Sequence, residues 1–321
     1  MKHLKTFFLA ALGLFMFCTS ALADNTFLLS GGDRSAGSTY DSVATQLMDK
    51  CRGIFSSGAG VTTSSGGLAN RDALRLGQVD SAMMPIDLLY ALRMSSASAV
   101  KDIKLLVYLY PEMLHFMGPP AIDRSTDMEK FKNKIGMGEL KVQRISDISG
   151  LTGLRVGAVG ASAITAKIVS GISGLNYTVV EYANAKEMMA GHDAGQLDAV
   201  LLIGGYPYRA VDGMPQGWTI LSIPKTISDK LAASKLYAPS MVSYASRGSD
   251  RETVSVMSAI FVRQPRSNDR KQELTKFREC FFDSVSKYAD ARGVHPVWRD
   301  MLDASDQAAL SSWELVNLQS K

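Results

Sequence analysis

The sequence predicts an α/β chain built from two similar lobes. Short apolar stretches that suit buried strands alternate with segments whose apolar residues recur at helical spacing, as in parallel sheets with helices on both faces. The alternation starts at residue 27 and starts again at residue 154. Residues 77–82 (GQVDSA) and 195–200 (GQLDAV) also echo each other, because each joins a helix end to a strand start.

The first half begins with a buried strand at 27–29. A helix from Ser38 follows, and Asp41 three residues on suggests a capping box. The next elements are predicted as strand 61–63, helix 68–76 ended by Gly77, strand 81–84 stopped by Pro85, and strand 103–110. This order indicates a parallel sheet.

The second half repeats the pattern with strands at 154–158, 177–180 and 199–203. One helix follows Ser162, and another over 184–190 has Asn184 and Glu187 as a cap pair. Later elements are predicted at 218–223, 227–233 and 254–262, before a long helix whose apolar face is Leu274, Phe277, Phe281, Val285 and Tyr288.

The segment 121–147 lies between the two halves, after the break at 118–120. It mixes basic residues with acidic ones, among them Lys130, Lys132, Lys134, Lys141 and Arg144 against Asp127, Glu129 and Glu139. We interpret it as a solvated excursion or short helix rather than a basic binding site.

Residues 1–23 are predicted to be a signal peptide. A basic start with Lys2 and Lys5 precedes an apolar run at 6–18 and a small-x-small cleavage pattern at 21–23. The alternative is an uncleaved membrane anchor, but the run is short for a span. We therefore expect an exported, periplasmic product that starts at Asp24.

Cleavage leaves two cysteines, Cys51 and Cys280. An oxidising compartment favours a disulfide between them. Two separate buried thiols are the alternative, because sequence does not give the distance.

The sequence lacks the residue patterns that several classes of function require. The formal charge of +4 becomes +2 without Lys2 and Lys5, too balanced for phosphate neutralisation, so we expect no nucleic-acid partner. The histidines after residue 23 stand alone in sequence, at 115, 192 and 295, so we expect no metal. Residues 156–161 lack the spacing of a dinucleotide loop, and no nucleophile elbow occurs. We expect no cofactor and no enzyme.

A strand, a loop of small residues and a helix start occur together three times, at 37–40, 64–67 and 160–163. Small residues let a ligand approach the backbone, and free N–H groups at a helix start favour an anion such as a carboxylate. Such loops line the crevice at the carboxyl ends of parallel strands. Ordinary capping and turns are the alternative for any one loop.

Three motifs resemble a known family. The first runs from a Gly-Ser loop at 62–67 through Asn70 and Leu74 to the turn at 77–82. The second is Asp198-Ala199 with 204–207 (GGYP), and the third is 151–157 (LTGLRVG). Together they resemble type II periplasmic solute-binding proteins, and most of all the TAXI group that serves TRAP transporters.

The resemblance implies a two-lobe type II periplasmic-binding-protein fold, with a mainly parallel sheet in each lobe and crossing hinge strands between them. Lobe one would be 24–116 plus 243–321, and lobe two 117–242. The family's ligand-binding positions transfer to Ser38, Thr39, Tyr40, Ser64, Ser65, Gly66, Gly160, Ala161, Ser162, Ala163, Gly205, Tyr206 and Pro207.

Two features of that set stay open. Tyr40 and Tyr206 either contact the ligand or are partly buried wall residues. Arg34, in a first loop poorer in glycine than the family's, pairs either with a carboxylate ligand or with Asp33.

The expected function is therefore capture of a small organic anion, an amino acid or carboxylate, for delivery to TRAP-type permease subunits in the membrane. We expect a monomer. The alternatives are the binding protein of an ABC importer and a periplasmic sensory or interaction module without transport.

Overall fold

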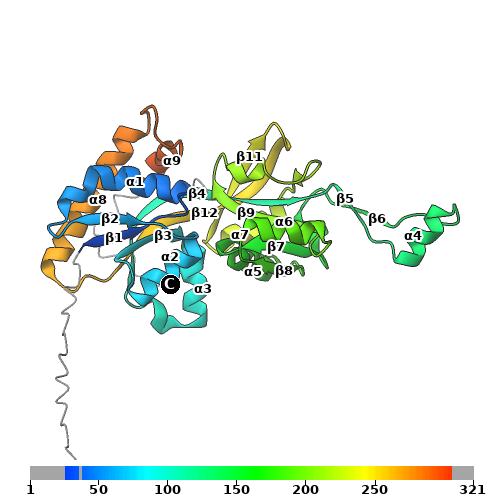
Figure 1. The fold of residues 1–321 in the computed structure, drawn as a ribbon, viewed down its shortest axis with the longest axis horizontal. Helices are drawn as coiled ribbons and strands as arrows, with labels where there is room; N and C mark the ends of the chain where they lie inside the picture. Colours follow the sequence, from blue (N-terminus) through cyan, green and yellow to red (C-terminus); the bar gives the residue numbers. More distant parts are fainter. Residues whose placement is uncertain (1–25, 36–37, 306–321) are drawn as a thin grey trace, which may run out of the picture.

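The computed structural model describes residues 26–35 and 38–305 and shows two α/β lobes side by side (Figure 1). The predicted signal peptide and its cleavage site lie outside the described residues. No helix within the described ranges is long and apolar enough to cross a membrane.

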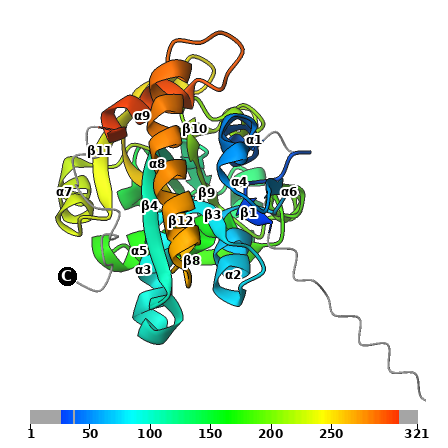
Figure 2. The same ribbon diagram turned by 90° about the vertical axis from the view of Figure 1, so that its left-hand side faces the viewer.

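Lobe one contains the parallel strands β2-β1-β3, which form one end of a 10-stranded sheet that continues through β12 and β4 into lobe two. Its first elements are β1 (Phe27–Ser30), α1 (Thr39–Cys51), β2 (Ala59–Thr62), α2 (Gly67–Leu76), β3 (Ser81–Pro85) and α3 (Ile86–Ser95). The late helices α8 (Asn268–Tyr288) and α9 (Val297–Ser305) return to it and share an apolar cluster with α1. Figure 2 shows α8 in front of the strands on this face. Helices α2 and α3 pack in a second cluster.

Lobe two has a second parallel set, in the order β9-β7-β8. Its elements are β7 (Arg155–Val159), α5 (Ala161–Ser173), β8 (Thr178–Tyr182), α6 (Ala185–Asp193), β9 (Ala199–Gly205) and α7 (Lys225–Ala233). Helices α5 and α7 share one apolar cluster, whereas α6 contributes Met188 to another. The restart seen in the sequence is therefore confirmed as a second lobe.

Two long antiparallel strands connect the lobes, β4 (Ile103–Gly118) and β12 (Gly248–Arg263). The sequence suggested that 103–110 continues the parallel alternation. That expectation is wrong, because β4 runs antiparallel to both β12 and β9. The short strand β10 (Thr219–Ile220) pairs with β4, and β11 (Tyr237–Tyr244) pairs with β12.

The apolar clusters of the two lobes show where β4 and β12 cross from one lobe to the other. On β4, Tyr110 packs in lobe one and Leu114 in lobe two, and on β12 the change falls between Val256 and Ala259. The proposed lobe boundaries at 116/117 and 242/243 remain a prediction.

The charged segment forms an arm that projects from lobe two (Figure 1). It consists of β5 (Ala121–Asp123), α4 (Asp127–Lys134) and β6 (Val142–Arg144). A capping box between Thr126 and Glu129 starts the helix, and most of the arm is exposed. The solvated short helix is confirmed. Four 3-10 turns complete the structure: η1 (Arg52–Ile54), η2 (Ala97–Val100), η3 (Ile148–Leu151) and η4 (Arg209–Val211).

A disulfide joins Cys51 at the end of α1 to Cys280 in α8, with 6.0 Å between the Cα atoms. The predicted pairing is confirmed. Both cysteines belong to the α1–α8 cluster of lobe one.

Candidate functional site

The floor of the candidate site is Glu112 on β4, at the point where this strand crosses between the lobes. Glu112 lies opposite Gly205 of β9, and its Oε2 accepts a hydrogen bond from the hydroxyl of Tyr40 at 2.9 Å. Glu112 thus contacts a predicted site residue of each lobe, Tyr40 through its side chain and Gly205 through strand pairing.

Burial raises the pKa of Glu112 from its usual 4.5 to about 8, because a desolvated carboxylate is disfavoured. The hydrogen bond from Tyr40 lowers this pKa, and the nearby carboxylate of Asp87 raises it. The pKa of Tyr40 is itself raised by burial first and then by Glu112.

The start of α1 delivers Tyr40 to this floor. Helix α1 begins at Thr39, whose Oγ1 lies 3.4 Å from Nε2 of His295. Ser38 is the N-cap residue, but its side chain makes no cap hydrogen bond, so the predicted capping box is wrong. Asp41 instead accepts hydrogen bonds from Arg34 at 3.0 and 3.2 Å.

Arg34 therefore pairs with Asp41, which neither alternative for this arginine had named. The guanidinium group of Arg34 in the first loop is therefore bound to a carboxylate of the protein itself. Fixed pairing of this kind leaves fewer donors for an anionic ligand.

The second loop packs on the first. Ser64 donates from its N–H to the Gly32 carbonyl at 3.2 Å and from its hydroxyl to the Gly31 carbonyl at 3.1 Å. Its hydroxyl also accepts from the Gly66 N–H, whereas Ser65 is exposed. These bonds place the predicted residues 64–66 beside the first loop.

The side chain of Asn70 connects the first loop to strands β1 and β3. Its Nδ2 donates to the carbonyls of Gly31 and Met83, each at 2.6 Å, and its Oδ1 accepts from the Ser30 hydroxyl at 2.6 Å. Asn70 is fully buried, so these contacts satisfy polar groups that water does not reach.

In lobe two, residues 160–163 form the start of α5. Gly160 is the N-cap residue with φ of 53°, a conformation that favours glycine, and it provides no side-chain cap. Ala161 packs against the α2–α3 cluster of lobe one, and Ala163 is buried. The uncapped N–H groups of α5 therefore start where the lobes touch.

Residues 205–207 complete the set. A Cβ atom on Gly205 would lie 2.9 Å from Val297 and 3.1 Å from the Tyr110 ring, so only glycine fits. Tyr206 is half-buried and donates its hydroxyl to the Ser243 carbonyl at 2.7 Å, and the exposed Pro207 follows a cis bond. This Tyr206 contact matches a wall residue.

The lobes also meet through Asp87 on α3. Its Oδ2 accepts from the hydroxyl of Thr165 on α5 at 2.5 Å and from that of Tyr237 on β11 at 3.1 Å. Burial raises the pKa of Asp87 from 3.8 to about 6, and the two hydroxyl donors lower it. Helix α3 packs against α5 at this contact.

The structure thus gathers Tyr40 and Gly205 at Glu112, and places 38–39, 64–66 and 160–163 at helix starts. Their role in ligand binding stays a prediction. The sequence reasoning missed Glu112, Asp87 and Tyr110. The signal for Glu112 was present, since it is the one acidic residue in the apolar strand 103–118.

Metal ions require clusters of ligand side chains. The described part of the chain contains no group of three histidine, cysteine or acidic residues arranged to hold a metal ion.

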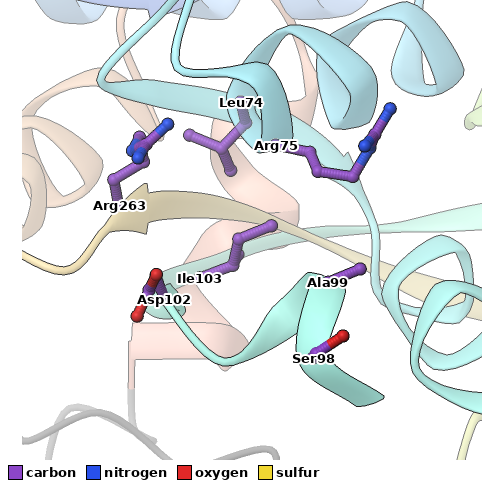
Figure 3. A pocket seen from close by; sticks show the side chains of 7 residues that line it. All are labelled: Leu74, Arg75, Ser98, Ala99, Asp102, Ile103 and Arg263. Atoms are coloured by element: carbon purple, nitrogen blue, oxygen red, sulfur yellow. The ribbon is translucent and has the colours of Figure 1, made fainter. Parts of the chain in front are cut away.

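A separate pocket of about 250 Å³ lies at the far end of lobe one (Figure 3). Ile103 and Arg263 line it, and they are the ends of β4 and β12 most distant from the crossing. None of the predicted site residues lines this pocket.

No family model matches the chain. Among solved structures, XAC2383 from Xanthomonas citri bound to ATP is 10% identical, with a TM-score of 0.47 over 88% of this chain and 90% of that one. An ancestral arginine-binding protein bound to arginine is 13% identical, with a TM-score of 0.46 over 87% and 98%. The periplasmic VFT2 domain of BvgS from Bordetella pertussis is 11% identical, with a TM-score of 0.43 over 83% and 94%.

An arginine 3rd transport system periplasmic binding protein from Legionella pneumophila is 12% identical, with a TM-score of 0.44 over 87% and 99%. The two-lobe α/β architecture is evident in the strand order of the chain itself, with parallel sets on either side of two crossing strands.

Proposed function

We propose that the protein is an extracytoplasmic solute-binding protein, which captures a small molecule between its lobes and delivers it to a membrane transporter. The observation that carries this proposal is the meeting of Tyr40, Glu112 and Gly205 at the strand crossing. Two lobes joined at such a crossing close around a ligand, and closure favours the liganded form.

The short motifs of residues 62–82 and 198–207 favour a TRAP-type transporter as the recipient. An ABC importer is the second candidate, since substrate-binding proteins of amino acid ABC transporters are among the solved structures similar to this chain. Uptake that stops when the ion gradient is collapsed supports the TRAP system. Uptake that stops only on ATP depletion supports the ABC system.

A periplasmic sensory module is the third candidate, and it would bind its solute without any uptake. In all three cases we propose binding without turnover. Release of an altered solute from the purified protein would contradict this part of the proposal.

Thermal-shift measurements on the exported form test the proposal. We expect at least one of three solute classes, amino acids, dicarboxylates or 2-oxo acids, to raise the melting temperature, because a ligand that binds only the folded state stabilises it. We expect Ser38→Ala, Ser65→Ala and Tyr206→Ala to weaken the binding of that solute.

Ser286→Ala serves as the matched control, since Ser286 is an exposed serine of α8 that bonds only to the Phe282 carbonyl. Unchanged affinity in all three site variants would show that the site lies elsewhere.

A further inference from the structure

The crossing between the lobes contains two buried carboxylates without a basic partner. Glu112 and Asp87 are 6% and 0% exposed. The side chains that donate hydrogen bonds to them all do so through hydroxyls: Tyr40 to Glu112, and Thr165 and Tyr237 to Asp87. Asp87 also has backbone hydrogen bonds at the start of α3. Among the described residues, no lysine, arginine or histidine pairs with either of them. Burying a carboxylate without a cation is costly, and a cationic ligand would supply the missing charge.

Polar atoms beside Glu112 are also left without partners. The hydroxyl of Tyr110 is fully buried and has no hydrogen-bond partner within the described ranges. Oδ1 of Asp87 is likewise buried and lacks a partner there. Tyr110 and Glu112 are two residues apart on β4, so their side chains lie on the same face of the strand. Burial and then the Glu112 carboxylate raise the pKa of Tyr110. Such orphaned buried atoms are uncommon and call for a ligand or ordered water.

The surrounding wall is aromatic. The rings of Tyr40 and Tyr110 lie 6.1 Å apart, and Tyr208 is the third tyrosine close to Glu112. Tyrosine faces attract ammonium groups, and a carboxylate within a group of tyrosine rings is a typical arrangement for binding an organic cation.

We infer that the solute carries a protonated amine or a quaternary ammonium group, and that Glu112 is its counter-ion. This inference rests on the proposed solute-binding function and replaces the expected anion with an ammonium compound. A zwitterion fits as well, since its carboxylate could face the uncapped start of α5. A metal ion is disfavoured, because the described residues supply only two carboxylates at this place.

Binding is then coupled to proton release. In the free protein the Glu112 carboxyl keeps its proton below pH 8, and the arriving ammonium group displaces that proton to solvent. The titratable groups that face Glu112 are Tyr40 from α1, Asp87 from α3, Tyr110 on β4 and Tyr208 after β9. The affinity for the cation should therefore rise with pH, by up to about tenfold per unit, and level off above pH 8.

Calorimetry and thermal shift with choline, n-propylamine, L-alanine and propionate provide the test. We expect at least one of the three ammonium compounds to bind and propionate not to bind. Titration of that ammonium compound in two buffers of different ionisation enthalpy should show the release of nearly one proton at pH 7.

Glu112→Gln keeps the shape and removes the charge, so it should weaken binding of the cation at least tenfold and abolish its pH dependence. Glu139→Gln makes the same change at an exposed position of the arm and should leave both unchanged. Tyr110→Phe removes only the unpartnered hydroxyl and should reduce affinity several-fold while the melting temperature of the free protein is kept.

The outcomes separate the two proposals. Binding of propionate without any of the ammonium compounds leaves the solute-binding function standing and overturns this inference. Ammonium binding that is equally tight in Glu112→Gln also overturns it. If none of the four probes and none of the three solute classes binds, the two proposals fail together.

Discussion

The turns that enter β3 and β9 are the most similar parts of the two lobes. Asp80 accepts a hydrogen bond from the backbone N–H of Leu28 at 2.9 Å, and Asp198 accepts one from the backbone N–H of Arg155 at 2.8 Å. Gly77 and Gly195 both have positive φ. The echo between 77–82 and 195–200 is therefore a shared device that ties each of these strands to its parallel neighbour.

The helices before these turns differ at equivalent offsets. Asn70 in α2 is a buried polar residue whose side chain bonds to the first loop and to β3 of lobe one, whereas Met188 in α6 is a buried apolar residue. The N-cap of α2 is Gly66, without a side-chain bond, whereas Asn184 caps α6 by accepting from the Glu187 N–H. Lobe one thus fixes its first loop through Asn70 and leaves the start of α2 without a side-chain cap, whereas in lobe two a side chain caps the start of α6.

Exchanging the two buried residues should break this difference most strongly. We expect Asn70→Met to lower the free energy of unfolding by about 3 kcal/mol, because the carbonyls of Gly31 and Met83 lose their buried donor. Met188→Asn should also destabilise, because it places an amide in an apolar cluster. Urea unfolding measures both, and a cost of Asn70→Met below that of an ordinary surface substitution would contradict this account.

The two aspartates should differ in how much they stabilise. Asp198 accepts three hydrogen bonds from Arg155, so Asp198→Ala should cost about 2 kcal/mol, against about 1 kcal/mol for Asp80→Ala. Burial raises the pKa of Asp198, but its bonds to Arg155 outweigh burial and lower it below 3.8. The stabilisation by Asp198 is therefore complete at neutral pH and is lost as the pH falls below about 4. Equal costs at pH 7, or a cost of Asp198→Ala that does not shrink at low pH, would refute this comparison.

The smallest effect is expected at the cap of α6. Asn184→Ala should cost about 0.5 kcal/mol, because the N–H of Glu187 loses its acceptor at an exposed helix start. Asn184→Ser should retain most of the stability, since serine also caps helices. Thermal unfolding of both variants against the unchanged protein measures the difference, and equal melting temperatures for Ala and Ser would show that the cap contributes nothing.

The alternation of apolar stretches was sufficient to predict most elements of the parallel sets. It was not sufficient for α3, because Pro85 reads as the end of a strand and also stands as the N-cap of the next helix. It also missed β11, whose polar and partly exposed residues carry little strand signal. Pairing direction in β4 depends on β12, which is more than a hundred residues away in sequence.

The candidate site was predictable where it depends on loops and not where it depends on the crossing. Gly205 and Tyr40 follow from motifs, but Glu112 becomes central only once β4 brings it between them. Arg34 shows the same limit, since its partner Asp41 is set by how the first turn of α1 folds back. Local chemistry can be inferred from sequence, whereas the choice among possible partners requires the tertiary structure.

The bond between Cys51 and Cys280 has a consequence for how the molecule works in an oxidising compartment. It links two helices of the same lobe, α1 and α8, and Tyr40 belongs to α1. Oxidation therefore stiffens the half of the molecule that holds Tyr40, and the polypeptide between the halves carries no covalent brace within the described residues. Redox conditions can therefore change the stability of lobe one without adding a covalent bond between the lobes among the described residues.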